Sequence, residues 1–462
     1  MNAALRVRGW REGWWPDVAI VAFVFLLYTN IPALVRQAYE LPTLVAGAYV
    51  VLLVPPLVHV MLRGHRLRVD AVLLLMLLFL AVLLASSLRA PLMPFAVQRI
   101  FTYVFEGIVL YWLVVNVVTG MTTLRRVIGT VLIAGAFLGS LSTWQAVTSS
   151  NYEFGGLAAR DWEMIEKAER EGRAAGRPLA QYRGADRAEG PVDEPNRYAQ
   201  LMIVLLPLAL VPIRHATTRS ARVTGTAVAL LVLAGVVLSY SRGAAVALAV
   251  LAVALSAVGW LHPARLLAGA VALVVLGAVA APGYYQRVAS IGTATSVFAD
   301  NGGRGADGAI RGRMTEMLAA LHAALDHPVL GVGPAQYWKV YSAQYHQVPG
   351  IQFKEIRGTR RAHSLYLELA ADTGAVGFTT FLAIVGTAMV ALWRARLRYA
   401  TQRPELSDLA TALWLSVFIY MVTGAFLHLA FERYFWFLLA LAGASVSVMS
   451  NEAVRPSPGV KP

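Results

Sequence analysis

The sequence predicts an all-α polytopic membrane protein with about twelve transmembrane helices and two polar regions between them. Hydrophobic residues make up 58% of the chain, charged residues make up only 14%, and the mean hydropathy is +0.59. A soluble globular domain has about 25% charged residues. The chain also contains apolar runs of about 20 residues, the length that a helix needs to cross roughly 30 Å of hydrocarbon. Composition and run length together exclude an ordinary soluble protein.

Each apolar run is expected to form one spanning helix. The runs lie near residues 17–36, 42–62, 69–87, 96–118, 124–147, 197–213, 222–240, 243–260, 264–282, 365–393, 408–429 and 432–449. Only Ser241 and Arg242 separate the seventh run from the eighth, so this boundary is the least distinct. The first run follows three arginines and lacks a cleavage site of small residues, which indicates a retained helix rather than a signal peptide.

The arginines of the short loops alternate along the chain as the positive-inside rule requires. With a cytoplasmic N-terminus, the loops expected inside contain Arg63/Arg66/Arg68, Arg125/Arg126, Arg214/Arg219/Arg222, Arg265 and Arg394/Arg396/Arg398/Arg403. The short outer loops contain few arginines, such as Arg36 and Arg89. Twelve helices then place both termini in the cytoplasm. The formal net charge of +14 is largely explained by this topology, and no separate basic domain indicates nucleic-acid binding.

Two polar regions interrupt the helices on the non-cytoplasmic side. The resulting segments are helices 1–5 (1–147), a first loop (148–196), helices 6–9 (197–282), a large loop (283–364), helices 10–12 (365–450) and a cytoplasmic tail (451–462). The first loop contains a charged helical pattern at 161–170, expected to be a solvated surface helix. In the large loop, apolar spacing predicts a helix over 311–325 that ends at Asp326-His327-Pro328. The glycine-rich stretch 300–308 is expected to be a flexible loop.

Arginines gather where the chain meets the outer membrane boundary. Arg242 lies between two apolar runs, where a charge is costly unless it is paired or functional. A snorkelling arginine at a helix end is an equally good interpretation. Arg313 falls in the first turn of the 311–325 helix, and Arg187 precedes a turn-rich segment that ends at Asn196. Asn196 is expected to cap the helix that follows it, with ligand binding as the alternative.

His363 differs from the other eight histidines by its location. It begins the tenth helix directly after an arginine-rich approach that ends at Arg361. A neutral imidazole can accept a proton from a hydroxyl, and nearby cations lower its pKa and keep it neutral. Asp372 lies further along the same helix and is expected to pair with an arginine or a polar neighbour. Arg433 lies between the last two helices on the same face.

Several arginines at one membrane boundary are typical of a site for an anionic phosphate ligand. Guanidinium groups bind phosphate oxygens bidentately and can neutralise a diphosphate leaving group. The chain has no cysteine, which excludes thiolate catalysis and thiolate metal sites. The outer loops contain no Asp-Xaa-Asp pair and no other spacing typical of metal ligands. We therefore predict that the protein works without a metal and without a cofactor.

Four sequence blocks, in order, resemble a known family. His363-Ser364 followed by Gly374-Ala375-Val376-Gly377 resembles the signature of the bacterial O-antigen ligase and polymerase superfamily. The upstream blocks are Arg187-x-x-Gly190 with Pro195-Asn196, Ser239-x-Ser241-Arg242-Gly243, and Arg313 with His327-Pro328-Val329-Leu330-Gly331-Val332-Gly333. The resemblance covers roughly residues 180–445. The first polar loop, 148–196, is longer and more charged than is usual in this family.

The resemblance implies a glycosyltransferase of the GT-C type in the inner membrane of a Gram-negative bacterium, with a periplasmic active site. Such a ligase transfers O-antigen from undecaprenyl diphosphate to a hydroxyl of lipid A–core by an inverting single displacement. By position, His363 would be the general base, and Arg242 and Arg313 would hold the diphosphate. The further substrate-binding candidates are Arg187, Asn196, Arg361 and Arg433.

Three alternative functions remain open. An O-antigen polymerase would pass the glycan to a second undecaprenyl-linked repeat, and a protein O-oligosaccharyltransferase would pass it to a Ser or Thr of a periplasmic protein. A transporter or flippase for an anionic lipid belongs to a different class and requires polar residues near the bilayer midplane. The runs at 69–87 and 243–260 are almost purely apolar, which favours an enzyme with its site on one face.

Overall fold

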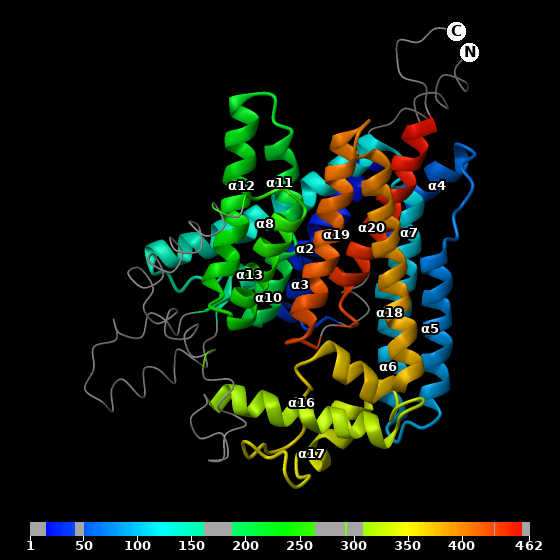
Figure 1. Cartoon of the computed structure of the whole chain (residues 1–462), viewed down its shortest axis with the longest axis vertical. Coiled ribbons are helices and arrows are strands. Elements are labelled where there is room, and N and C mark those ends of the chain that lie inside the picture. Colours follow the sequence, from blue (N-terminus) through cyan, green and yellow to red (C-terminus); the bar gives the residue numbers. More distant parts are fainter. Residues whose placement is uncertain are drawn as a thin grey trace.

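The computed structural model describes residues 15–41, 50–160, 187–262, 308–428 and 430–454, with the single residues 264 and 292. Its described part is a bundle of long helices with a further helix, α16 (Gly308–Asp326), lying across one end (Figure 1). We call this end the α16 end. The helix predicted at 264–282, apart from residue 264, and the charged pattern at 161–170 lie outside the described residues.

Seven helical stretches among the described residues are long and apolar enough to cross a membrane. They are α6 (Met93–Tyr103) continued by η2 (Val104–Val109) and α7 (Leu110–Val117), α8 (Met121–Thr148), α10 (Pro195–Ile203) continued by α11 (Leu206–Arg214), α12 (Arg219–Leu238), α18 (Leu365–Tyr399), α19 (Pro404–Gly424) and α20 (Arg433–Val454). The chain is therefore a mostly helical, multi-pass membrane protein.

Three further apolar helices are shorter than a full span: α4 (Val54–Leu62) with the turn before it, α5 (Ala71–Ser87) and α13 (Arg242–Ala257). Each coincides with a predicted run, and the count of twelve spans stays a prediction. The predicted boundary between the seventh and eighth runs is confirmed, because α12 ends at Leu238 and α13 begins at Arg242. The hydroxyl of Ser241 caps α13 by accepting a hydrogen bond from the Ala244 amide at 3.3 Å.

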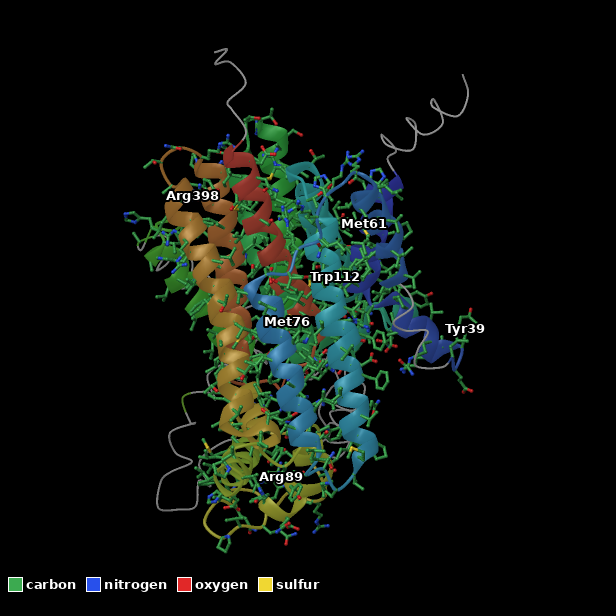
Figure 2. All side chains as sticks on the ribbon, turned by 90° about the vertical axis from the view of Figure 1, so that its right-hand side faces the viewer. Tyr39, Met61, Met76, Arg89, Trp112 and Arg398 are labelled. Carbon is green, nitrogen blue, oxygen red and sulfur yellow. The ribbon has the colours of Figure 1, made fainter. Side chains whose placement is uncertain are left out.

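The first apolar run, predicted as one helix over 17–36, is a bent pair instead. Helix α2 (Trp15–Thr29) and helix α3 (Ile31–Ala38) meet at 62°. Asn30 between them has a left-handed backbone (φ 54°), which asparagine tolerates better than most residues, and Pro32 cannot donate a backbone hydrogen bond to the preceding turn. Helix α3 therefore turns away from α2, and Tyr39 at its end projects from the side of the bundle (Figure 2).

A two-stranded sheet is a small departure from the predicted all-α fold. Strands β1 (Ala159–Arg160) and β2 (Ala188–Gly190) pair antiparallel, with Ala159 opposite Gly190 and Arg160 opposite Ala188. A 3₁₀ turn, η3 (Phe154–Gly156), precedes β1. The sheet joins the two described ends of the first polar region and leads directly into α10.

Buried aromatic rings join α5, α6, α18 and α20. The Phe79 and Tyr103 rings meet edge to face at 5.2 Å, Tyr103 contacts Trp436 at 5.1 Å, and Phe381 stacks on Phe435 at 5.5 Å. In a bilayer these helices gain little from the hydrophobic effect, so close packing of large side chains is what holds them together. The hydroxyl of Tyr103 donates a hydrogen bond to the Met76 carbonyl at 2.8 Å.

The glycines of the large loop and of α18 allow two distant segments to pair through their backbones. We call the hydrogen bonds between 328–333 and 371–376 the backbone pairing; they are Val332 N to Ala371 O (2.9 Å), Gly333 N to Asp372 O (2.9 Å), Ala375 N to Pro328 O (2.7 Å) and Val376 N to Val329 O (3.3 Å). Helix α18 is kinked at Gly374 (φ 63°, ψ −168°). A Cβ atom at Gly374 would lie 2.3 Å from the Val329 carbonyl, and one at Gly331 would lie 2.4 Å from the Asp372 backbone. These glycines are required by close backbone approach.

Asp372 reinforces the backbone pairing. The residue is 2% exposed, and its carboxylate accepts hydrogen bonds from the amides of Ala335 (2.9 Å) and Tyr337 (3.0 Å). The sequence predicted an arginine or a polar neighbour as the partner of Asp372. The observed partners are these two backbone amides. The second amide begins η6 (Tyr337–Tyr341), which leads into α17 (Ser342–Tyr345). The large loop is held against α18 at a defined register.

Three labelled residues lie near loops that the sequence assigns to opposite sides of the membrane. Arg89 lies at the α16 end, whereas Arg398 and Met61 lie toward the other end (Figure 2). The side of the membrane that each end of the bundle occupies stays a prediction from the alternation of basic and non-basic loops.

Candidate active site

A cavity of about 340 Å³ lies between α16 and the N-terminal ends of α10 and α13. Its polar lining consists of Arg187, Asn196, Tyr240, Arg242 and Arg313. Its remaining lining is apolar and consists of Gly243, Val246, Ala309, Ile310, Met314, Met317 and Phe426. The cavity lining therefore combines cationic and apolar side chains. A lipid with an anionic headgroup requires both kinds of contact.

The N-terminus of α13 places Arg242 at the cavity. Free amides at the start of a helix and the helix dipole favour an anion at this position. Tyr240 just before it has a left-handed backbone (φ 48°), which is costly for a bulky residue and is held by the surrounding contacts. The hydroxyl of Ser241 donates to the Asn196 side-chain oxygen at 2.7 Å. Residues 239–242 are thus fixed from both the helix and its neighbour.

Arg187 and Asn196 hold the segment that carries Arg242. The Arg187 guanidinium donates to the Ser239 carbonyl at 2.9 Å and to the Asn196 side-chain oxygen at 3.2 Å. Asn196 is not the helix cap that the sequence predicted. The cap of α10 is Glu194, whose carboxylate accepts from the amides of Asn196 (3.1 Å) and Arg197 (2.7 Å). Pro195 occupies the first helical position, where its missing amide costs nothing.

His363 lies at the start of α18 and close to α16. It has a left-handed backbone (φ 47°), and Ser364 after it caps the helix. Its Nε2 atom lies 3.5 Å from a carboxylate oxygen of Glu316. Burial, followed by the Arg313 guanidinium, lowers the pKa of His363 to about 4, so the ring is neutral at neutral pH. This neutral state agrees with the expectation from the sequence.

Arg361 and Arg433 are engaged elsewhere and do not line the cavity. The Nε atom of Arg361 lies 3.0 and 3.2 Å from the two carboxylate oxygens of Glu368, and its guanidinium also lies over the Trp338 ring. Arg433 donates to the side-chain oxygen of Asn30 and lies 3.9 Å from Glu106. Arg361 thus contacts the start of α18, and Arg433 links the start of α20 to the residue between α2 and α3. Substrate binding by either arginine stays a prediction.

Two residues near His363 were not predicted from the sequence. Glu316 lies on α16 one turn after Arg313, and this spacing places both side chains on one helix face. Burial raises the pKa of Glu316 to about 7, although Arg360 and Arg313 oppose the shift. The His428 ring lies 5.5 Å from the His363 ring, and burial lowers the pKa of His428. Nothing in the sequence near residue 428 indicates this contact, because it depends on how α19 and α20 pack against α18.

Residues 227–382 match the family model described as O-antigen ligase. This match covers about a third of the chain and supports a relationship to the O-antigen ligase superfamily. The matched segment contains Arg242, Arg313 and His363, of which the two arginines line the cavity. Arg187, Asn196 and Phe426, outside the matched segment, complete the cavity lining. The match supports a glycosyltransferase-like enzyme of lipopolysaccharide biosynthesis. A comparison with curated proteins gave no match. Among the residues described, no group of three or more His, Cys, Asp or Glu side chains is placed to hold a metal ion.

Proposed function

We propose that this protein is an O-antigen ligase that transfers a glycan from undecaprenyl diphosphate to a hydroxyl of lipid A–core. The observation that carries the proposal is the cavity in which three arginines face an apolar wall, because a lipid diphosphate presents the same two chemistries to a protein. The family match supports the same reaction class. In this proposal the cavity lies on the periplasmic face of the inner membrane of a Gram-negative bacterium, and both termini are cytoplasmic.

The diphosphate binds to Arg242 and Arg313, with Arg187 and Asn196 holding the segment that presents Arg242. Guanidinium groups and the N-terminus of α13 stabilise the charge that develops on the leaving group. The isoprenoid chain follows the apolar wall toward the bilayer, along residues such as Met314 and Phe426.

The acceptor hydroxyl is activated by His363. As the hydroxyl oxygen attacks the anomeric carbon of the donor, the imidazole takes the hydroxyl proton. The bond from that carbon to the diphosphate breaks, and undecaprenyl diphosphate leaves with the electron pair. A single displacement of this kind inverts the anomeric configuration and requires no covalent intermediate. No metal and no cofactor takes part in the proposed reaction.

The decisive experiment is a transfer assay with the purified full-length protein and an undecaprenyl-diphosphate-linked glycan. Three acceptors are offered separately: lipid A–core, a second donor molecule and a Ser/Thr-rich periplasmic protein. Product on lipid A–core alone supports the ligase. Product on the second donor identifies a polymerase, and product on the protein identifies a protein O-oligosaccharyltransferase. If no acceptor is modified, a transporter of anionic lipid becomes the better explanation.

A further inference from the structure

The carboxylate of Glu316 lies beside the one nitrogen of His363 that can exchange a proton. The Nδ1 atom of His363 is buried and has no hydrogen-bond partner among the described residues. The other ring nitrogen, Nε2, lies 3.5 Å from a Glu316 oxygen. The residue Glu316 is 8% exposed, so bulk water does not easily replace this contact.

The backbone around Glu316 is fixed from several sides. The Tyr337 hydroxyl donates to the Glu316 carbonyl at 3.2 Å, and Tyr337 is itself held by Asp372. The hydroxyl of the neighbouring Thr315 accepts hydrogen bonds from the amides of Phe353 (3.1 Å) and Lys354 (3.3 Å). Helix α16 is therefore attached to the same loop that carries His363, and the Glu316–His363 distance is set by the fold.

Charged side chains from α16, from the loop before α18 and from α18 surround Glu316 and His363. The groups that act on the charge of Glu316 or His363 are Arg313 on α16, Lys354, Arg360 and Arg361 in the loop before α18, and Glu368 on α18. The Tyr337 hydroxyl and the His428 ring lie close to Glu316 and His363 respectively. Arg313, Arg360 and Arg361 disfavour an imidazolium at His363, whereas Glu368 favours it. A carboxylate next to Nε2 offsets the three arginines.

We propose that Glu316 is a positioning residue that acts through His363, stabilising the imidazolium and then receiving its proton. This role rests on the proposed function. In the transfer step the hydroxyl O–H bond breaks and an Nε2–H bond forms on His363. The Nε2–H bond then breaks as an O–H bond forms on Glu316, and Glu316 later releases the proton to water. His363 with a pKa of about 4 cannot hold a proton at neutral pH, whereas Glu316 with a pKa of about 7 can.

The test compares the pH profile of kcat in the wild type with that of Glu316→Gln, which removes the charge and keeps the shape. Because Glu316 must be ionised to receive a proton, wild-type kcat should fall as the pH drops below about 7. In Glu316→Gln we expect kcat to be lower by roughly 10- to 100-fold, a part of the total of about 10²–10⁴-fold that general bases contribute. The KM for the donor should stay within about twofold, and the fall of kcat near pH 7 should disappear.

Two further variants keep the test decisive. Glu316→Asp retains a titrating carboxylate at a longer distance from Nε2, so it should lose less activity and keep the fall near pH 7. Glu355→Gln removes an exposed carboxylate of the same loop, which pairs with Arg357, and should match the wild type in activity and in yield from detergent. If Glu316→Gln folds poorly, Glu316→Asp against the wild type still measures the effect of moving the carboxylate.

The failure of this role and the failure of the proposed function give different results. If the wild type makes no product with any acceptor, both the proposed function and the proposed role of Glu316 are wrong. If the wild type is active and Glu316→Gln keeps its kcat or its pH profile, only the role of Glu316 is wrong. A raised donor KM with an unchanged kcat would also overturn it, because that result would place Glu316 in donor binding.

Discussion

Replacing Asp372 with alanine is expected to release the large loop from α18 without unfolding the bundle. The carboxylate is buried and is hydrogen-bonded to the amides of Ala335 and Tyr337. A buried N–H group left without a partner costs about 1–3 kcal/mol, so the loss of both acceptors costs about 2–6 kcal/mol. Because about 1.4 kcal/mol is a factor of ten, local opening of the loop should increase by at least roughly 30-fold.

Asparagine at the same position should have a smaller effect. Its carbonyl oxygen can accept one of the two hydrogen bonds, while its NH₂ group faces the other amide as a second donor. Asp372→Asn is therefore expected to cost about 1–3 kcal/mol, the loss for a single amide. The destabilisation of the loop should therefore increase from Asp372→Asn to Asp372→Ala. Because Asp and Asn have nearly the same size, the Asn variant isolates the loss of one hydrogen-bond acceptor.

Hydrogen–deuterium exchange in a membrane mimetic measures this directly, in peptides that cover residues 331–341. Exchange at residues 335 and 337 should increase in the order wild type, Asp372→Asn, Asp372→Ala, while peptides from α19 and α20 stay protected. Glu405→Ala, at an exposed position in the first turn of α19, is the control and should not change exchange in the loop. Unchanged protection at 335 and 337 in Asp372→Ala would refute the assignment of these hydrogen bonds as the loop anchor.

The remaining predictions concern the site and its support. His363→Ala should lower kcat by about 10²–10⁴-fold and leave donor binding intact, as measured by steady-state kinetics and a donor-binding assay; near-normal turnover would exclude it as the base. Arg242→Ala and Arg313→Ala should each weaken donor binding by about 1.5–3 kcal/mol, the value of a hydrogen bond to a charged group, in the same binding assay. Gly374→Ala should destabilise the protein by more than the about 1–3 kcal/mol of a strained backbone, because its Cβ would also meet the Val329 carbonyl; an unchanged melting temperature in detergent would contradict this. EDTA should leave transfer unchanged, and a loss of activity that magnesium restores would show that a metal is needed.

The spans could be predicted because a bilayer imposes the same length requirement on every helix. Predicted runs and observed helices agree for α5, α8, α12 and α20 to within a few residues. The sequence did not predict the break between α2 and α3 at Asn30, because hydropathy does not report the backbone conformation of a single residue within an apolar run. The cap of α10 was misassigned to Asn196 although Pro195 favours the first helical position, so the residue before it, Glu194, had to be the cap.

The candidate site was only partly predictable, for a different reason. Arg187, Asn196, Arg242 and Arg313 could be singled out by local context, and they line one cavity. Partners across long sequence separations could not be read from a pattern. The contact of Glu316 with His363 depends on packing between α16 and α18, and the engagement of Arg361 by Glu368 depends on how the chain enters α18.

The backbone pairing closes residues 334–370 into a loop whose base is fixed and whose tip is exposed. Gly350 lies near the middle of this loop and is exposed, and a Cβ atom added there would have no neighbouring atom within 4 Å. Lengthening a closed loop is inexpensive, since doubling its length adds only about 0.6 kcal/mol of closure entropy. A short epitope inserted at Gly350 should therefore be tolerated, and antibody access to it in sealed vesicles would report which side of the membrane the α16 end occupies.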